Sequence, residues 1–260
     1  MRIKIALMPI KAERIKVPVN YNYLIQSFIY RNLESRLSQF LHNEGFKFEK
    51  RSFRMFVFSR LFGKYTYSPE EKILSFERTV SFYLASPHTE ILERFAESII
   101  REPEVRIFKQ DLFVSSIEVM RRKIFPEEVF IKAISPITIH STLYTGEGKK
   151  KTYYYTPFEK EFTALIERNI KKKYSAFYKR TGEGKLTIEP IKVKAGNEKV
   201  VIYKGFTIKG WMGIYRLHGS PELIAFSYYT GLGDRNPQGF GMWEEYTFPN
   251  PHRNYLDKNK

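Results

Sequence analysis

The hydrophobic pattern of the first forty residues changes from a period of two to a helical period. Apolar side chains occupy alternate positions in Arg2–Met8, which indicates a strand with one buried face. From Tyr21 to about Leu41 the apolar residues recur every three or four positions, which predicts an amphipathic helix. One row on this helix advances by four residues at every step: Ile25, Ile29, Leu33, Leu37 and Leu41.

This row cannot stay on one face of a straight helix. Each residue turns through about 100°, so four steps of four residues move the row by roughly 160° around the axis. A bend or break near Glu34–Ser38 would relieve the drift, and we predict one there.

The rest of the first half completes a β-α-β-β-α-β order. Ser86-Pro87 favours the start of a second helix, because proline suits the first helical position, and Glu102-Pro103 ends it. A turn at Gly63–Pro69 joins the two middle strands. Strands are expected at 53–62, 73–84, 105–108 and 112–120. This order is typical of a ferredoxin-like domain.

The second half predicts the same order of elements, although it shows no close sequence repeat. A capping box at Thr156–Glu159 begins a helix that runs to about Phe177, and Ser220-Pro221 begins a short helix. The basic segment Gly146–Lys151 is expected to be a loop. Strands are expected at 129–139, 186–194, 200–215 and 240–246.

We therefore predict an α+β fold of tandem ferredoxin-like domains with a glycine-rich loop near the C-terminus. The expected boundaries are 1–122 for an N-terminal domain that carries the catalytic site, 123–248 for a C-terminal domain and 249–260 for a polar tail. The length of 260 residues suits one large or two modest domains.

The charge of the chain narrows the class of its partner. Its 44 Lys and Arg residues exceed its 28 Asp and Glu residues, which leaves a formal net charge of +16. Basic side chains that neutralise phosphates release condensed counterions, so this excess favours a polyanion, above all a nucleic acid. A Lys- and Glu-rich surface of the kind found in thermophiles is the alternative explanation.

Composition also excludes several classes of protein. The chain has no Cys, hence no disulfide and no thiolate-bound metal. Its five His residues are scattered without the spacing of a metal site, so we expect no metal and no cofactor. No apolar run approaches the ~20 residues of a membrane span, and the N-terminus lacks a signal-peptide core. We therefore expect a cytoplasmic protein without a membrane partner.

A glycine-rich loop is expected at Gly231–Gly241. Its glycines permit a close approach of the backbone, and its amides could cradle phosphates. The loop matches neither a Walker sequence nor a dinucleotide fingerprint, since no Gly-Lys-Ser/Thr follows and no helix begins after it. A long hairpin connection is the plainer alternative. The glycines that we expect near RNA are Gly231, Gly233, Gly239 and Gly241.

Two sets of motifs together are more specific than the loop alone. A capped helix followed by G-L-G-x-x-N-x-x-G-F-G-M resembles the signature of the repeat-associated mysterious protein superfamily of CRISPR systems. The N-terminal half is similar to the family of CRISPR repeat-processing endoribonucleases. The matching positions are Val17-Pro18-x-Asn20, Tyr23-Leu24-x-Gln26-x-Phe28-Ile29-Tyr30, Leu41-His42 and Phe56-x-Phe58-Ser59.

The resemblance covers nearly the whole chain and implies a specific reaction. Members of the family have tandem ferredoxin-like folds and cut precursor CRISPR RNA within each repeat without a metal. The 2′-hydroxyl attacks the adjacent phosphate and leaves a 2′,3′-cyclic phosphate and a 5′-hydroxyl. A non-catalytic repeat-RNA-binding subunit of a CRISPR effector complex is the alternative, and both a monomer and a homodimer remain open.

The resemblance also implies site residues. It places the family's catalytic tyrosine on Tyr30 and its catalytic histidine on His42. The third residue is a cation: ungapped matching back from Phe56 gives Arg54, with Lys50 or Lys47 as substitutes. Such a reaction needs a base, an acid and a cation beside the phosphorane, and histidine titrates in the useful range.

Geometry sets a condition on this pair. Tyr30 and His42 are 12 residues apart, which on one straight helix is a separation of ~18 Å along the axis. They can share one phosphate only if the helix breaks between them. Otherwise Tyr30 is a core aromatic and His42 a helix-end histidine bound to terminal carbonyls.

Several basic clusters are candidates for contact with RNA phosphates. A single basic run is usually a solvated face, but on an RNA-binding fold some runs should touch the substrate. Runs in loops have the freedom to reach RNA. Our first choices are Lys149, Lys150, Lys151 and Arg235.

Overall fold

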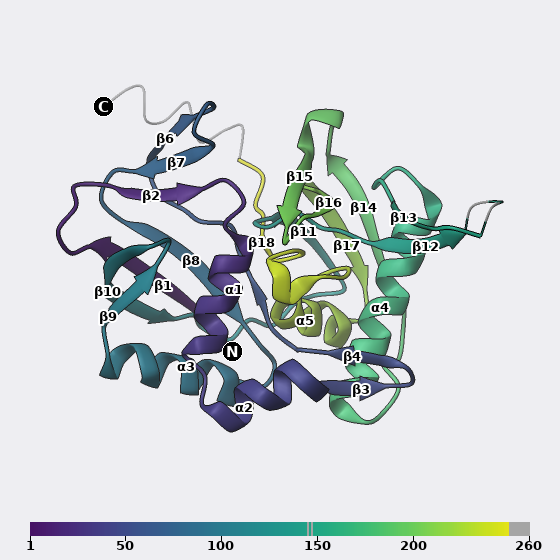
Figure 1. The fold of residues 1–260 in the computed structure, drawn as a ribbon. Helices are drawn as coiled ribbons and strands as arrows, with labels where there is room; N and C mark the ends of the chain where they lie inside the picture. Colours follow the sequence, from purple (N-terminus) through teal and green to yellow (C-terminus); the bar gives the residue numbers. More distant parts are fainter. Residues whose placement is uncertain (145, 147, 250–260) are drawn as a thin grey trace, which may run out of the picture.

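Two antiparallel sheets form the body of the protein and lie side by side (Figure 1). The structure is a computed structural model that describes residues 1–144, 146 and 148–249. The predicted polar tail lies outside the described residues from position 250 onward. Position 147 of the predicted loop Gly146–Lys151, and position 145 just before it, also lie outside them.

The N-terminal sheet has the strand order β5-β8-β1-β10-β9. Its strands are β1 (Arg2–Pro9), β5 (Val57–Phe58), β8 (Val80–Ala85), β9 (Glu104–Ile107) and β10 (Gln110–Val119). Ile3, Ile5 and Leu7 of β1 are buried, as their alternation predicts. Helices α1 (Asn22–Arg31) and α3 (Thr89–Arg101) meet through Phe28 and Phe95, whose ring centroids are 5.6 Å apart.

The C-terminal sheet has the strand order β14-β17-β11-β18. Its strands are β11 (Glu128–Ala133), β14 (Leu186–Lys192), β17 (Ile214–Gly219) and β18 (Trp243–Glu245). The long helix α4 (Lys160–Tyr178) and the short helix α5 (Pro221–Thr230) belong to this half. Tyr174, Tyr215 and Trp243 are fully buried in its core.

The two sheets share a four-strand core of the same topology, to which the N-terminal sheet adds β9. In the N-terminal sheet, β1 lies between β8, which precedes α3, and β10, which follows it. In the C-terminal sheet, β11 lies in the same way between β17, which precedes α5, and β18, which follows it. This arrangement confirms the prediction of tandem ferredoxin-like folds.

The predictions of one strand at 53–62 and of a turn at 63–69 are wrong in detail. The strand is divided into β4 (Arg51–Phe53) and β5 because Met55 between them has a positive φ of 52°. The predicted turn contains β6 (Tyr65–Ser68), which pairs with β7 (Ile73–Phe76). Strand β7 also pairs with β2 (Ile15–Pro18), and β4 pairs with β3 (Phe46–Phe48).

The predicted strand 200–215 is also divided. It forms a hairpin of β15 (Glu198–Tyr203) and β16 (Phe206–Trp211), which turns at Lys204 and Gly205, both with positive φ. The predicted basic loop is in part a strand, since β13 (Lys150–Tyr154) pairs with β12 (His140–Tyr144). No helix in the described part of the chain is long and apolar enough to cross a membrane.

Candidate active site

The first predicted helix is broken, close to the predicted point. Helix α1 ends at Arg31, and the short helix α2 (Ser35–Gln39) begins after Glu34, whose ψ of 141° is extended. Asn32 favours the break, because its side-chain amide donates a 2.8 Å hydrogen bond to the Phe28 carbonyl and so competes with helical bonding. The drift of the hydrophobic row therefore predicted the break correctly, but placed it a few residues nearer the C-terminus than it is.

A turn of π-helix, η1 (Phe40–Glu44), follows α2 and carries His42. The Gly45 amide closes it with a 2.8 Å hydrogen bond to the Phe40 carbonyl. π-Helical turns recur at functional sites because they re-aim single side chains. The Ser38 hydroxyl donates to the Tyr30 carbonyl at 3.2 Å, which holds α2 against the end of α1.

The break brings the two predicted catalytic side chains together. The ring centroids of Tyr30 and His42 are 6.3 Å apart, with the rings nearly perpendicular. His42 is exposed, and its Nδ1 lies 3.0 Å from the Asn43 side-chain oxygen. Tyr30 is half-buried and packs edge to face on Phe56. The condition that the sequence set on this pair is met.

Arg54 lies beside both residues. Its guanidinium donates to the His42 carbonyl at 2.8 Å and to the Ser52 hydroxyl at 2.6 Å. Burial raises the pKa of Tyr30, and the nearby Arg54 opposes part of this rise. Arg54 therefore fixes the π-helical turn and places its guanidinium next to the tyrosine.

One cavity of about 720 Å³ joins these residues to the glycine-rich loop. Tyr30, His42 and Arg54 line it from the N-terminal half, and residues 234–238 line it from the C-terminal half. Arg51 also lines the cavity, although the sequence did not single it out. Lys47 and Lys50 are not among its lining residues, and Lys47 pairs instead with Glu44 at 3.7 Å.

The glycines of the loop serve close packing. Gly231, Gly233, Gly239 and Gly241 are all buried and all have positive φ. A Cβ on Gly233 would collide with the Thr138 carbonyl oxygen, and one on Gly239 with the Phe58 ring. The loop residues that line the cavity are 234–238, between the two glycine pairs.

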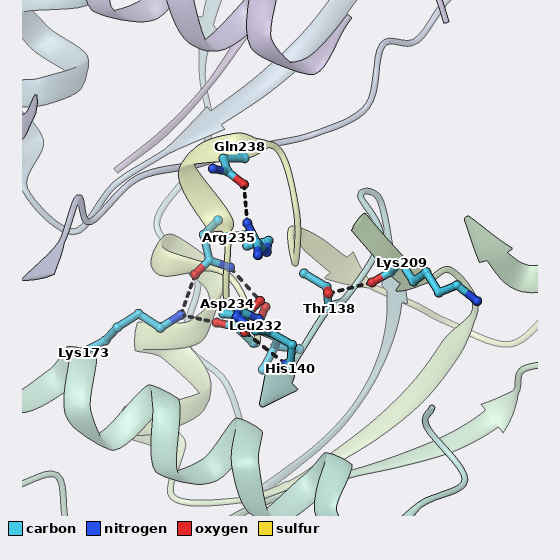
Figure 2. Close-up of polar contacts among 10 residues, drawn as sticks. Thr138, His140, Lys173, Lys209, Leu232, Asp234, Arg235 and Gln238 are labelled. Atoms are coloured by element: carbon cyan, nitrogen blue, oxygen red, sulfur yellow. Dashed lines mark hydrogen bonds and ion pairs between the residues drawn. The ribbon is translucent and has the colours of Figure 1, made fainter. Parts of the chain in front are cut away.

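Both halves of the protein hold this loop. From α1, the side-chain amides of Asn22 and Gln26 donate 2.7 Å hydrogen bonds to the Gln238 and Pro237 carbonyls. On the other side, the Asp234 amide donates to the Thr138 carbonyl at 2.9 Å. Figure 2 shows the loop residues Asp234, Arg235 and Gln238 among their polar neighbours.

The loop side chains also contact β12 and β13. The Asp234 carboxylate lies 2.5 Å from the His140 Nδ1 and accepts from the His140 amide at 3.1 Å. The Arg235 guanidinium lies 5.9 Å from the centre of the Tyr154 ring. Arg235 also lines the main cavity.

A second cavity of about 410 Å³ adjoins the first, since Arg51 and Asn169 line both. Arg168, Lys172 and His140 line it further along, toward the β12–β13 hairpin. The basic residues 149–151, which follow β12 in the chain, line neither cavity. Across residues 1–144, 146 and 148–249, no group of three or more His, Cys, Asp or Glu side chains could hold a metal ion.

Two family models together match nearly the whole chain. The model for the N-terminal part of CRISPR-associated protein Cas6 matches residues 16–118, and the model for the C-terminal part matches residues 119–245. The chain belongs to the Cas6 family. The resemblance found in the sequence motifs is thereby confirmed.

Individual Cas6 proteins are similar over the same length. The CRISPR-associated endoribonuclease Cas6 of Pyrococcus furiosus is 29% identical over 251 residues, 93% of this chain and 89% of the relative. The CRISPR-associated endoribonuclease-like protein Cas6nc of Pyrococcus horikoshii is 27% identical, covering 93% and 98%. A solved structure of a Cas6-related protein from Pyrococcus furiosus has a TM-score of 0.83 and 27% identity, covering 96% and 99%.

The Cas6 motifs did not reveal every residue at the cavity. Arg51 lies in a basic segment, Lys50-Arg51, where sequence alone cannot tell which side chain points inward. Alternation along β4 would not have identified it, because Arg51, Ser52 and Phe53 all line the cavity. Lys173 and Asn169 lie on α4 and were hidden within a helix whose charged residues suggest a solvated face.

Proposed function

We propose that this Cas6 chain is an endoribonuclease that cuts CRISPR repeat RNA into mature guide RNA. The observation that carries the proposal is the broken helix, which brings Tyr30 and His42 to one cavity with Arg54. The relative from Pyrococcus furiosus that is named an endoribonuclease supports the reaction class. The net charge of +16 supports a polyanionic substrate.

The proposed reaction uses side chains alone. The 2′-oxygen of one nucleotide attacks the adjacent phosphorus, and its proton passes to His42 as general base. The bond from phosphorus to the 5′-oxygen of the next nucleotide breaks, and that oxygen takes up a proton. The products are a 2′,3′-cyclic phosphate and a 5′-hydroxyl, and no metal or cofactor enters the balance.

Tyr30 suits the role of the acid or of an orienting donor. Because burial raises the pKa of Tyr30, its hydroxyl keeps its proton at neutral pH and has it available for donation. Arg54 suits the stabilisation of the phosphorane, since its guanidinium lines the cavity beside Tyr30 and His42 and can donate to phosphate oxygens. Arg51, which lines the same cavity, offers a second cation for the phosphate.

We propose that the RNA strand continues from the main cavity into the second one. Arg51, Arg168 and Lys172 there can pair with successive phosphates, although Lys172 also pairs with Glu49 at 2.9 Å. Arg235 beside Tyr154 can contact a phosphate or a base from the loop. The basic hairpin at Lys149–Lys151 would then meet RNA farther from the cut.

A non-catalytic RNA-binding subunit is the second candidate. The similarity to a relative named endoribonuclease-like favours it. So does Arg54, which already donates hydrogen bonds to two protein oxygens. Effector subunits as partners, a monomeric or homodimeric state and a cytoplasmic location stay predictions.

Cleavage of cognate repeat RNA separates the two candidates. The wild-type chain is incubated with repeat RNA in EDTA, beside the same RNA with a 2′-deoxy substitution at the cleavage position. We expect cutting in EDTA that stops with the deoxy substrate. Binding without cutting would leave only the RNA-binding subunit, and cutting that EDTA abolishes would overturn the metal-free mechanism.

A further inference from the structure

A buried lysine holds the glycine-rich loop from beneath. Lys173 of α4 is 2% exposed, and its ammonium donates to the carbonyls of Gly231 at 2.7 Å and Gly233 at 3.1 Å. It also donates to the Asn236 side-chain oxygen at 2.8 Å. Figure 2 shows Lys173 reaching up from α4 into the loop.

The three partners match the charged form of the side chain. An ammonium group has three N–H donors, and here three oxygens accept from it. A neutral amine has two donors and a lone pair, so one of these oxygens would face a lone pair instead. Burial lowers the pKa of Lys173 to about 7, and the neighbouring Asp234 carboxylate acts in the opposite direction.

Stability alone does not account for a lysine at this position. A buried charge carries a large desolvation cost, and apolar residues of similar volume are often equally or more stabilising. The three bonds, however, fix two glycine carbonyls and the side chain of Asn236. The Asn236 amide in turn donates to the Leu232 and Phe240 carbonyls, at 3.1 and 3.0 Å, and so ties both ends of the loop.

The bonded segment leads directly into the cavity wall. Asp234 and Arg235 lie between the two Lys173 contacts at Gly233 and Asn236, and both line the cavity. On the other side of the loop, Gln26 holds the Pro237 carbonyl and accepts from the Tyr203 hydroxyl. The backbone that carries Arg235 is therefore fixed from both halves of the protein.

We propose that Lys173 is a positioning residue, whose ammonium holds the glycine-rich loop so that Arg235 stands at the RNA cavity. The cleavage part of this inference rests on the proposed function, whereas the effect on the loop does not. Lys173 acts through the loop and does not itself need to touch RNA.

Hydrogen exchange of the full chain tests the loop directly. The Lys173→Met variant removes the donors with little change in volume, and Lys171→Met on the same helix is the matched control. We expect faster exchange of the Leu232, Asp234 and Gly241 amides in Lys173→Met, with β1 still protected. Unchanged exchange at these three amides would overturn the proposal, whether or not the protein cleaves RNA.

Kinetics distinguish positioning from simple attraction of RNA. With repeat RNA at saturation, we expect kcat to fall about 10- to 100-fold in Lys173→Met, because small displacements of a site cost such factors. The salt dependence of RNA affinity should match that of Lys171→Met. A kcat equal to the control with a reduced salt slope would show that Lys173 is only a phosphate contact and overturn the proposal.

Loss of protection in β1 would show that Lys173→Met unfolds as a whole. In that case a second variant tests the proposal. Lys173→Gln retains two N–H donors without the charge. We expect its loop amides to exchange faster than in the wild type while β1 stays protected. Full protection of the loop amides in this variant would show that the ammonium charge is not needed to hold the loop, and would overturn the proposal.

Discussion

The two walls of the cavity are built in opposite ways. The N-terminal wall consists of short segments, a π-helical turn and strand β4, and its histidine is exposed. The C-terminal wall is a loop whose four glycines are buried and whose backbone is held by Lys173, Asn236 and two side chains of α1.

This difference suggests that the two walls have different functions. An exposed side chain on a short turn can take up and release a proton without rearranging a core. A loop packed at van der Waals distance can hold a charged side chain in one place, but it tolerates little change in its own sequence. Substitutions in the first wall should therefore impair chemistry, and those in the second should impair stability and positioning.

The largest effect is expected at the exposed wall. His42→Ala should lower the rate of repeat cleavage by about 10²- to 10⁴-fold, the range typical of general acid–base catalysis. RNA affinity should change little, because Arg51, Arg54 and Arg235, which also line the cavity, are unchanged in this variant. His218→Ala, at an exposed position on β17, is the matched control.

Single-turnover rates and filter binding measure the two quantities separately. An equal loss of rate and affinity in His42→Ala would show that His42 does not take part in the proton transfer. The N-terminal wall would then affect binding and not chemistry.

The loop wall should respond through stability. Gly233→Ala places a Cβ against the Thr138 carbonyl at a φ of 69°, where strain and overpacking together cost about 2 to 5 kcal/mol. Gly196→Ala is the control, since nothing lies within 4 Å of its Cβ. Urea unfolding measures both. A Gly233→Ala variant as stable as the control would show that the loop is not closely packed.

The sequence predicted more of the first wall than of the second. The row from Ile25 to Leu41 required a break, and the motif positions Tyr30 and His42 then had to meet. In the second wall the glycines were recognised, but their role was expected to be contact with phosphate. Packing against Thr138 and Phe58 depends on residues 95 and 181 positions away in the chain, which no local pattern reveals.

Arg51 was missed for a similar reason, and Lys173 was counted only as one member of a basic cluster. A lysine in the run Lys171–Lys173 looks like part of a solvated face, and only the tertiary fold buries the last of the three. Local periodicity does distinguish faces of a helix, yet the loop that covers this face is formed by residues some sixty positions later.

Tyr30 tests whether the exposed wall carries the second proton. Tyr30→Phe should lower the cleavage rate about 10- to 100-fold, less than His42→Ala, because water can replace a lost donor in part. Tyr23→Phe, at an exposed position on the same helix, is the control. Because burial raises the pKa of Tyr30 above its ordinary value, loss of its proton should not limit the rate between pH 8 and 9. A falling rate between pH 8 and 9 that Tyr30→Phe abolishes would contradict this.

The smallest effect should come from the cation that both cavities share. Arg51→Gln removes one positive charge from the RNA path, and a single phosphate contact on a single strand changes the slope of log affinity against log salt by about 0.7. Lys50→Gln removes the same charge one residue away, outside both cavities, and should leave the slope nearly unchanged. Binding of uncleavable 2′-deoxy repeat RNA at several salt concentrations measures this difference. Equal slopes for the two variants would mean that RNA does not pass Arg51, and the strand would then have to leave the active site along the loop wall.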